Sequence, residues 1–117
     1  LMQNPDLAPY IPQILGRSEF RTYQCGDTVQ SAIAPRSAAV PSGCQFIDAI
    51  GGGPQLLPEL TATEEGFTDP NVGRDSIGMT QRNSRSAIGI KPDGSVVLVM
   101  AAQKPDAPGN SGMSVQA

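Results

Sequence analysis

Two runs separated by a tight turn, residues 83–90 and 95–100, constrain the fold more than any other feature. The second run, residues 95–100, is rich in valine, which favours strands over helices. Pro92-Asp93-Gly94 supplies the turn, because proline fixes φ and glycine accepts a positive φ. The pattern predicts a β-hairpin, and Arg85 lies near the start of its first strand.

The 13 glycines and 11 prolines make up about a fifth of the 117 residues. Glycine and proline at this density favour short strands joined by many turns. Alternating polar and larger residues predict further strands over 19–24, 29–34 and 45–50. The expected fold class is α+β, with an antiparallel or mixed β-sheet and one or two short helices.

The first expected helix begins at Asn4-Pro5 and ends at Gly16, because asparagine caps a helix and proline suits its first position. We expect this helix to pack four apolar side chains inward, namely Leu7, Ile11, Ile14 and Leu15. The second expected helix starts at Thr61, where Thr61 and Glu64 fit the capping-box pattern. It would continue through Phe67.

Charge and composition exclude several classes of function. The net charge is −3 and no basic stripe is present, so nucleic acid is not an expected partner. No apolar run approaches the ~20 residues that a membrane-spanning helix needs. The chain has no histidine and no Cys-x-x-Cys motif, so we expect neither a metal site nor a cofactor.

Cys25 and Cys44 are the only cysteines, and both occur in polar, turn-rich segments. Two buried thiols are one interpretation. A disulfide is the alternative that we favour, because an even number of cysteines in loop-rich sequence is typical of exported proteins. We therefore expect a secreted, periplasmic or cell-surface protein.

Four motifs in a fixed order resemble the phosphodiester glycosidase family: Gly51-Gly52-Gly53-Pro54, the segment 83–90 with its Asn-Ser-Arg-Ser-Ala-Ile-Gly sequence, the turn Asp93-Gly94, and Ser111-Gly112-Met113-Ser114. The resemblance extends over residues 47–117. Residues 1–46 would add the first helix, strands and the cysteine pair. The two parts are expected to form one domain.

The same resemblance implies that the chain is an incomplete part of a larger domain. The family has an Asn-Gly-Gly-Phe-like segment earlier and an Asp-Gly-Gly motif later, and neither is recognisable here. The first residues, from Leu1 onward, look like the interior of a longer precursor. Because unpaired strand edges invite association, we expect another chain, a second copy or the missing part of the domain to cover them.

The resemblance also implies a site for a phosphorylated carbohydrate. Glycines 51, 52 and 53 would let backbone N–H groups approach an anion, although a plain bend between strands is the alternative. Arg85 would bind phosphate oxygens, or else pair with an acid such as Asp48 or Asp93. Asn83 and Ser86 would hold sugar hydroxyls or phosphate, or else make turn and strand-edge hydrogen bonds. The family has threonine after the arginine, and Ser86 keeps the hydroxyl.

The implied reaction is hydrolysis at the sugar–phosphate side of a carbohydrate phosphodiester. It requires an anion cradle and a carboxylate, for which Asp48, Glu64, Asp69 and Asp75 are weak candidates. We expect the carboxylate to come from the rest of the domain, so that these 117 residues alone are inactive. One alternative is a non-catalytic carbohydrate-binding or surface-assembly module, which the absence of a carboxylate within about 6 Å of the glycines would favour. Another is a purely structural fragment.

Overall fold

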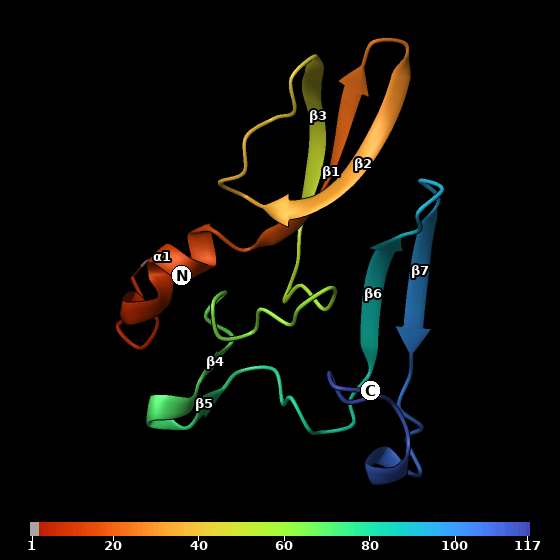
Figure 1. Ribbon diagram of the computed structural model, residues 1–117. Coiled ribbons are helices and arrows are strands. Elements are labelled where there is room, and N and C mark those ends of the chain that lie inside the picture. Colours follow the sequence, from red (N-terminus) through yellow and green to blue (C-terminus); the bar gives the residue numbers. More distant parts are fainter. Residues whose placement is uncertain (1–2) are drawn as a thin grey trace.

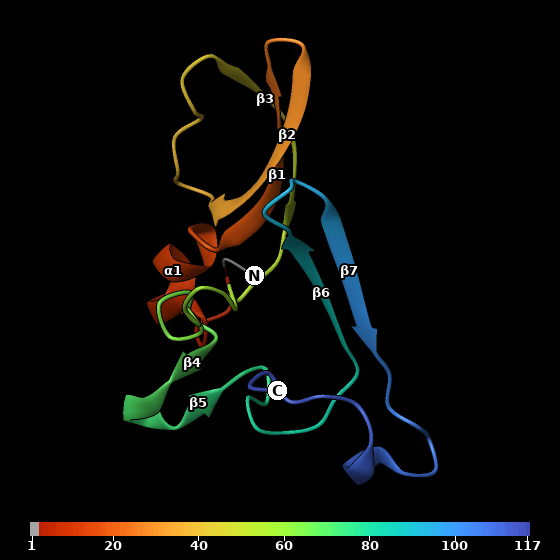
Figure 2. The same ribbon diagram turned by 45° about the vertical axis from the view of Figure 1, so that its right-hand side comes forward.

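The computed structural model describes residues 3–117, so that Leu1 and Met2, where the sequence was interpreted as the interior of a longer precursor, lie outside it. A three-stranded antiparallel sheet and a two-stranded hairpin lie next to each other without merging (Figures 1 and 2). The sheet has the order β2-β1-β3, built from β1 (Ser18–Cys25), β2 (Thr28–Pro35) and β3 (Cys44–Gly51). The hairpin consists of β6 (Arg85–Ile90) and β7 (Val96–Ala101).

Strands β1, β2, β3, β6 and β7 confirm the strands predicted from sequence, and the α+β class is confirmed with them. The boundary drawn at residue 46 falls inside β3, which pairs with β1 along its length. A small two-stranded element joins the sheets and consists of β4 (Thr68–Asp69) and β5 (Arg74–Asp75). The short helices are η1 (Ala8–Tyr10), α1 (Ile11–Leu15), η2 (Pro70–Val72) and η3 (Pro108–Asn110).

The helix predictions were only partly correct. Helical structure begins at Ala8 rather than at Pro5, because the Asn4 side chain accepts the Asp6 N–H in a local turn, and α1 ends before Gly16 as predicted. The predicted inward packing was wrong for Leu15, which is 46% exposed, whereas Leu7, Ile11 and Ile14 are half-buried. No helix forms over 61–67. The Thr61 hydroxyl donates to the Glu65 carboxylate, and the predicted capping box with Glu64 does not form.

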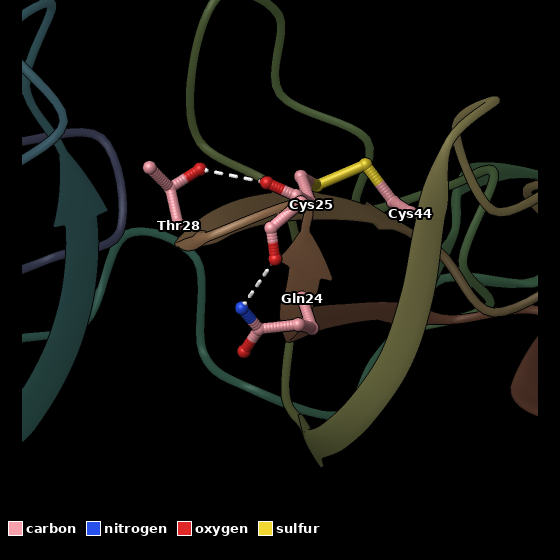
Figure 3. Close-up of a disulfide and its surroundings, with 5 residues drawn as sticks. Gln24, Cys25, Thr28 and Cys44 are labelled. Atoms are coloured by element: carbon pink, nitrogen blue, oxygen red, sulfur yellow. Dashed lines mark hydrogen bonds between the residues drawn. A yellow bond between two sulfur atoms is a disulfide. The ribbon is translucent and has the colours of Figure 1, made fainter.

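Cys25 and Cys44 form a disulfide (Figure 3). The two residues are directly opposite each other, at the end of β1 and the start of β3. Closing a loop with a sequence separation of 19 stabilises the folded chain by about 3 kcal/mol in the chain-entropy model. The disulfide therefore pins the register of β3, which is otherwise exposed along most of its length.

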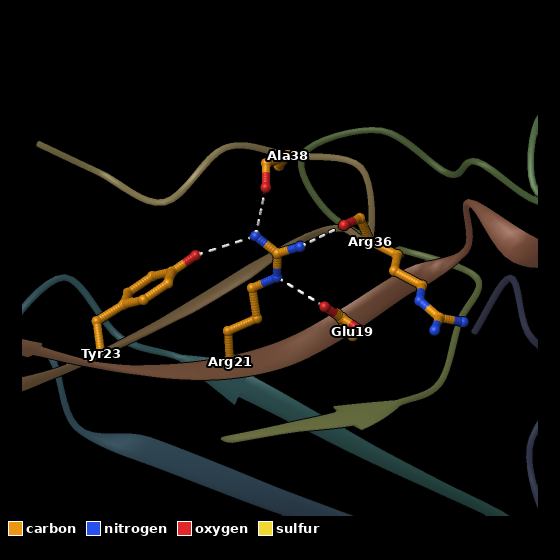
Figure 4. Close-up of polar contacts among 5 residues, drawn as sticks. All are labelled: Glu19, Arg21, Tyr23, Arg36 and Ala38. Carbon is orange, nitrogen blue, oxygen red and sulfur yellow. Dashed lines mark hydrogen bonds and ion pairs between the residues drawn. The ribbon is translucent and has the colours of Figure 1, made fainter. Parts of the chain in front are cut away.

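Buried polar groups hold much of the sheet. Arg21 is 3% exposed, and its guanidinium donates to the Glu19 carboxylate (2.8 Å), the Tyr23 hydroxyl (3.3 Å) and the backbone carbonyls of Arg36 (2.6 Å) and Ala38 (2.8 Å) (Figure 4). The Tyr23 hydrogen bond, followed by that to Glu19, raises the pKa of Arg21. Arg21 thus fastens the segment after β2 onto β1.

The hairpin leaves an apolar surface in solvent. Met100 is 85% exposed and Leu98 is 76% exposed, and neither flank of β6–β7 pairs with a further strand in the described part of the chain. The Cα radius of gyration is 16.3 Å, whereas about 13 Å is typical of a globular domain with this number of residues. The two sheets therefore do not share one closed core.

Candidate functional site

Glycines 51, 52 and 53 continue the chain from β3 and line an open hollow of about 430 Å³, which we call the glycine hollow. Its remaining lining comes from α1, the start of β1, the end of β2 and the segment before β4. These residues are Ile14, Arg17, Ser18, Glu19, Arg36 and Phe67. The hollow therefore lies where four backbone segments, distant in sequence, meet at one end of the sheet.

Hydrogen bonding and packing fix the path of the glycine segment. The Gly52 N–H donates to the Ser18 carbonyl at 3.1 Å, which extends the β1–β3 pairing by one step. Gly53 has φ +115°, and a Cβ atom there would lie 2.7 Å from Glu65 Oε1 and 3.0 Å from the Phe67 ring. Only glycine fits position 53. By contrast, a Cβ atom at Gly51 or Gly52 would meet no atom within 4 Å.

The buried carboxylate of Glu65 lies next to this glycine segment. Glu65 is 6% exposed and accepts hydrogen bonds from the Ser18 N–H (2.6 Å), the Gln55 N–H (2.9 Å) and the Thr61 hydroxyl. Burial alone would raise the pKa of Glu65, but these hydrogen bonds outweigh burial and the pKa is lowered. Glu65 is therefore ionised at neutral pH and joins the start of β1 to Gln55 and Thr61, which follow the Pro54 bend.

Two arginines present cationic side chains to the glycine hollow. The Arg17 guanidinium lies 3.7 Å from the centroid of the Phe67 ring and donates to the carbonyls of Glu65 (2.8 Å) and Gly66 (3.2 Å). Burial lowers the pKa of Arg17, and the nearby Arg74 lowers it further. The Arg36 guanidinium makes no hydrogen bond or ion pair within residues 3–117.

Arg85, at the start of β6, lies in a different environment from the glycine hollow. Its guanidinium donates to four backbone carbonyls, those of Ile77 (2.8 Å), Gly78 (2.8 Å), Gln81 (3.2 Å) and Met113 (3.1 Å). It pairs with neither Asp48 nor Asp93, since the single salt bridge among the described residues joins Arg21 to Glu19. Four of the five N–H groups of Arg85 are thereby engaged.

The carboxylate of Asp75 also binds the backbone segment that Arg85 contacts. It accepts the backbone N–H groups of Ile77 (3.2 Å), Gly78 (2.8 Å) and Met79 (2.9 Å). The Met79 N–H is the largest cause of the lowered pKa of Asp75, and the charge of Arg85 also lowers it. Asp75 and Arg85 together therefore clamp the backbone over residues 77–81.

Asn83 and Ser86 flank Arg85 but do not join it in one cavity. The Asn83 backbone bridges Met113, with N–H···O distances of 3.1 and 3.0 Å. With its amide turned, the Asn83 side-chain oxygen accepts from Arg85 Nη2 at 3.2 Å. Ser86 follows Arg85 in β6, so the two side chains project to opposite faces of the hairpin. None of these residues lines the glycine hollow.

The other sequence-selected carboxylates lie elsewhere. Asp69 accepts the Tyr10 hydroxyl at 2.9 Å, whereas Asp48 and Glu64 are exposed. Sequence analysis missed Glu65, although the four-residue spacing from Thr61 would have been a usable signal. It also missed Arg17 and Arg36, which no local pattern distinguishes from surface arginines.

The described residues contain neither a metal-binding cluster nor a membrane-spanning helix. Within residues 3–117, no group of three or more histidine, cysteine or acidic side chains is arranged to hold a metal ion. Nor does that part of the chain contain a helix with the length and apolar character needed to cross a membrane. What the described residues do offer is two polar clusters, one at the glycine hollow and one around Arg85.

Comparison with known protein families identifies a match. The family model for phosphodiester glycosidase matches residues 14–117, which include both the glycine hollow and the Arg85 cluster. Neither the curated proteins nor the solved structures contain a match. Since the match covers nearly the whole chain, including all the motifs noted in the sequence, this protein belongs to the phosphodiester glycosidase family.

Proposed function

We propose that this chain forms part of an exported hydrolase that cleaves a carbohydrate phosphodiester at its sugar–phosphate side. The family match over residues 14–117 is the observation that carries the proposal. In this reaction a water oxygen bonds to the anomeric carbon of the sugar. The bond from that carbon to the phosphate oxygen breaks, and a phosphate monoester leaves with the bonding electrons.

The chemistry of the leaving group defines what the site must supply. Ordinary glycosidases use one carboxylic acid to protonate the leaving oxygen. A phosphate monoester is already a weak base, so the proposed reaction depends less on that acid and needs no cofactor. It depends instead on cations and N–H groups around the phosphate, and on a carboxylate that activates water or stabilises the sugar cation. We propose two separate groups of residues for anion binding, Gly51–Gly53 at the glycine hollow and Asn83, Arg85 and Ser86 at the start of β6.

The position of Glu65 does not meet the condition that would favour a non-catalytic binding module. The binding-module alternative expects no carboxylate within about 6 Å of the glycines. Glu65 Oε1 lies 2.7 Å from the position that a Cβ atom would take at Gly53. Both Glu65 oxygens are already hydrogen-bonded to this chain, so we assign Glu65 to positioning. The carboxylate that acts on water would come from the rest of the domain.

Export and a larger domain are further parts of the proposal. The Cys25–Cys44 disulfide supports an oxidising compartment, namely secretion, the periplasm or the cell surface. The unpaired edge of β7 supports the presence of further β-structure in the complete domain. This strand carries no charged residue or proline that would protect its edge from pairing. We propose that residues 1–46 and 47–117 form one domain with that additional structure, supplied by the same polypeptide or by another chain.

Replacing Arg85 by alanine is expected to lower kcat/KM for a sugar phosphodiester at least about 100-fold, because the reaction would lose a cation and the ordered backbone of residues 77–81. Release of phosphate monoester by the full-length protein measures this rate. Arg82→Ala is the matched control, since Arg82 is exposed and its side chain makes no hydrogen bond within the described residues. Equal rates for Arg85→Ala and Arg82→Ala would contradict the assigned role of Arg85.

Loss of activity in Arg85→Ala could reflect unfolding, so Ser86→Ala provides a second test. Ser86 is exposed in β6, and its hydroxyl makes no hydrogen bond within the described residues. Its removal is expected to leave the free energy of unfolding unchanged and to raise KM for the phosphodiester several-fold. An unchanged KM would remove Ser86 from the proposed site.

A further inference from the structure

Two arginines occupy neighbouring positions across the β1–β2 pair, at the entrance to the glycine hollow. The register pairs Ser18 with Pro35, and the next step pairs Arg17 with Arg36. The Arg36 N–H donates to the Arg17 carbonyl at 3.1 Å. Both side chains line the glycine hollow. Like charges at neighbouring cross-strand positions destabilise a sheet, so this pair would gain from an anion between them.

No acidic side chain of the hollow balances the two charges. Glu19 lines the hollow, but its carboxylate is bound by Arg21 Nε at 2.8 Å. Glu65 is not among the lining residues and is engaged by Ser18, Gln55 and Thr61. The lining therefore keeps a net positive charge, on a chain whose net charge is −3.

Hydrogen bonds fix the backbone of Arg36 and the side chain of Arg17, and both guanidinium groups keep free donors within residues 3–117. The Arg36 carbonyl accepts from Arg21 Nη2 at 2.6 Å, which fixes the backbone while the Arg36 side chain extends away from Arg21 (Figure 4). Arg17 is stacked on Phe67 and uses Nε and Nη2 for carbonyls, so Nη1 makes no hydrogen bond within residues 3–117. The backbone N–H of Gly53 likewise donates to no acceptor in that range.

From these observations we propose that Arg17 and Arg36, together with the backbone N–H of Gly53, form an anion subsite that binds one phosphate group. The ligand class is a phosphate monoanion attached to a sugar. Arg36 offers a planar fork that can bind two phosphate oxygens, and the neighbouring Arg17 adds a further donor through Nη1. The exposed glycines allow the ligand to approach the backbone without meeting a Cβ atom.

This inference rests on the proposed function for the identity of the ligand, but not for the binding itself. It assigns the phosphate to arginines that lie outside the Arg85 cluster. It also places two cationic side chains beside Gly51–Gly53. Arg85 does not supply a charge there, because Arg85 is absent from the lining of the hollow. Arg36, the exposed member of the pair, is the residue to substitute.

The test is the dissociation constant of the methyl phosphodiester of a hexose 1-phosphate, measured by calorimetry on the full-length protein. Arg36→Gln is expected to weaken binding about tenfold or more, whereas Arg82→Gln, the matched loss of an exposed arginine, leaves it unchanged. Arg36→Gln should also reduce the dependence of binding on salt concentration. Equal affinities for the Arg36→Gln and Arg82→Gln proteins would overturn the subsite.

A parallel hydrolysis assay separates this inference from the proposed function. Binding that depends on Arg36, without turnover of any sugar phosphodiester, would support the subsite and reject the hydrolase. Turnover that depends on Arg85, with binding indifferent to Arg36, would support the hydrolase and reject the subsite. Inorganic phosphate serves as a second probe, and its binding is expected to weaken in Arg36→Gln by a similar factor.

Discussion

Replacing Glu65 by glutamine is expected to lower the free energy of unfolding by about 3 kcal/mol, because three donors converge on a buried carboxylate. Glutamine keeps the size of the side chain but turns one acceptor into an amide donor. That donor would face the Ser18 N–H, or else the Gln55 N–H and the Thr61 hydroxyl. Urea unfolding of the two proteins measures the difference.

Glu64→Gln is the matched control, since Glu64 is adjacent in sequence and exposed, and it is expected to change stability by less than about 0.5 kcal/mol. The pH dependence gives an independent readout. Because the pKa of Glu65 is lowered on folding, its stabilisation is complete above the ordinary glutamate pKa of about 4.3 and is lost as pH falls through the folded pKa. The Glu65→Gln protein should lose less stability in acid. If the Glu65→Gln protein were as stable as the Glu64→Gln protein, the hydrogen bonds described for the Glu65 carboxylate would be wrong.

The second large effect is expected at Gly53. Alanine at position 53 would place a Cβ atom 2.7 Å from Glu65 Oε1, on a residue whose φ is +115°. The substitution would have to push the carboxylate away from its donors as well as strain the backbone. We expect the free energy of unfolding to fall by about 3 kcal/mol. Chemical denaturation, monitored by circular dichroism, measures it.

Gly52→Ala distinguishes steric conflict from a general need for glycine. Position 52 has no positive φ, and a Cβ atom there would have no neighbour within 4 Å. Its stability should therefore change by less than about 1 kcal/mol. If Gly53→Ala and Gly52→Ala had the same stability, the close approach of Gly53 to Glu65 would be wrong.

The strands could be predicted from sequence because their determinants are local. The turn at Pro92-Asp93-Gly94 and the valine-rich run after it define the β6–β7 hairpin within a short stretch of chain. The strands of the three-stranded sheet were predictable from their alternating polar and larger residues. The order of the four motifs indicated the family, and the family model then identified it. In contrast, the expected helix at Thr61 did not form, because Glu65 turns inward to bond the Ser18 N–H, 47 residues away.

The candidate site could be predicted only in part. The glycines were identifiable because a Gly-Gly-Gly-Pro sequence is unusual in any strand. Arg17 and Arg36 become neighbours only through the β1–β2 register, which brings together residues that no short motif connects. Glu65 was overlooked because an acid in a polar segment resembles a solvated side chain. Burial of such groups depends on tertiary contacts that local sequence does not encode.

The uncovered strand β7 has a consequence for how completion of the domain can be observed. Pairing with β6 leaves alternate backbone amides of β7 facing outward. These amides should exchange their protons with water quickly in the chain as described, because a two-stranded hairpin is only marginally stable without a covering layer. Slow exchange at Val96, Leu98 and Met100 would therefore report that another strand has docked there. The exchange rates of these β7 amides therefore measure whether the domain is assembled.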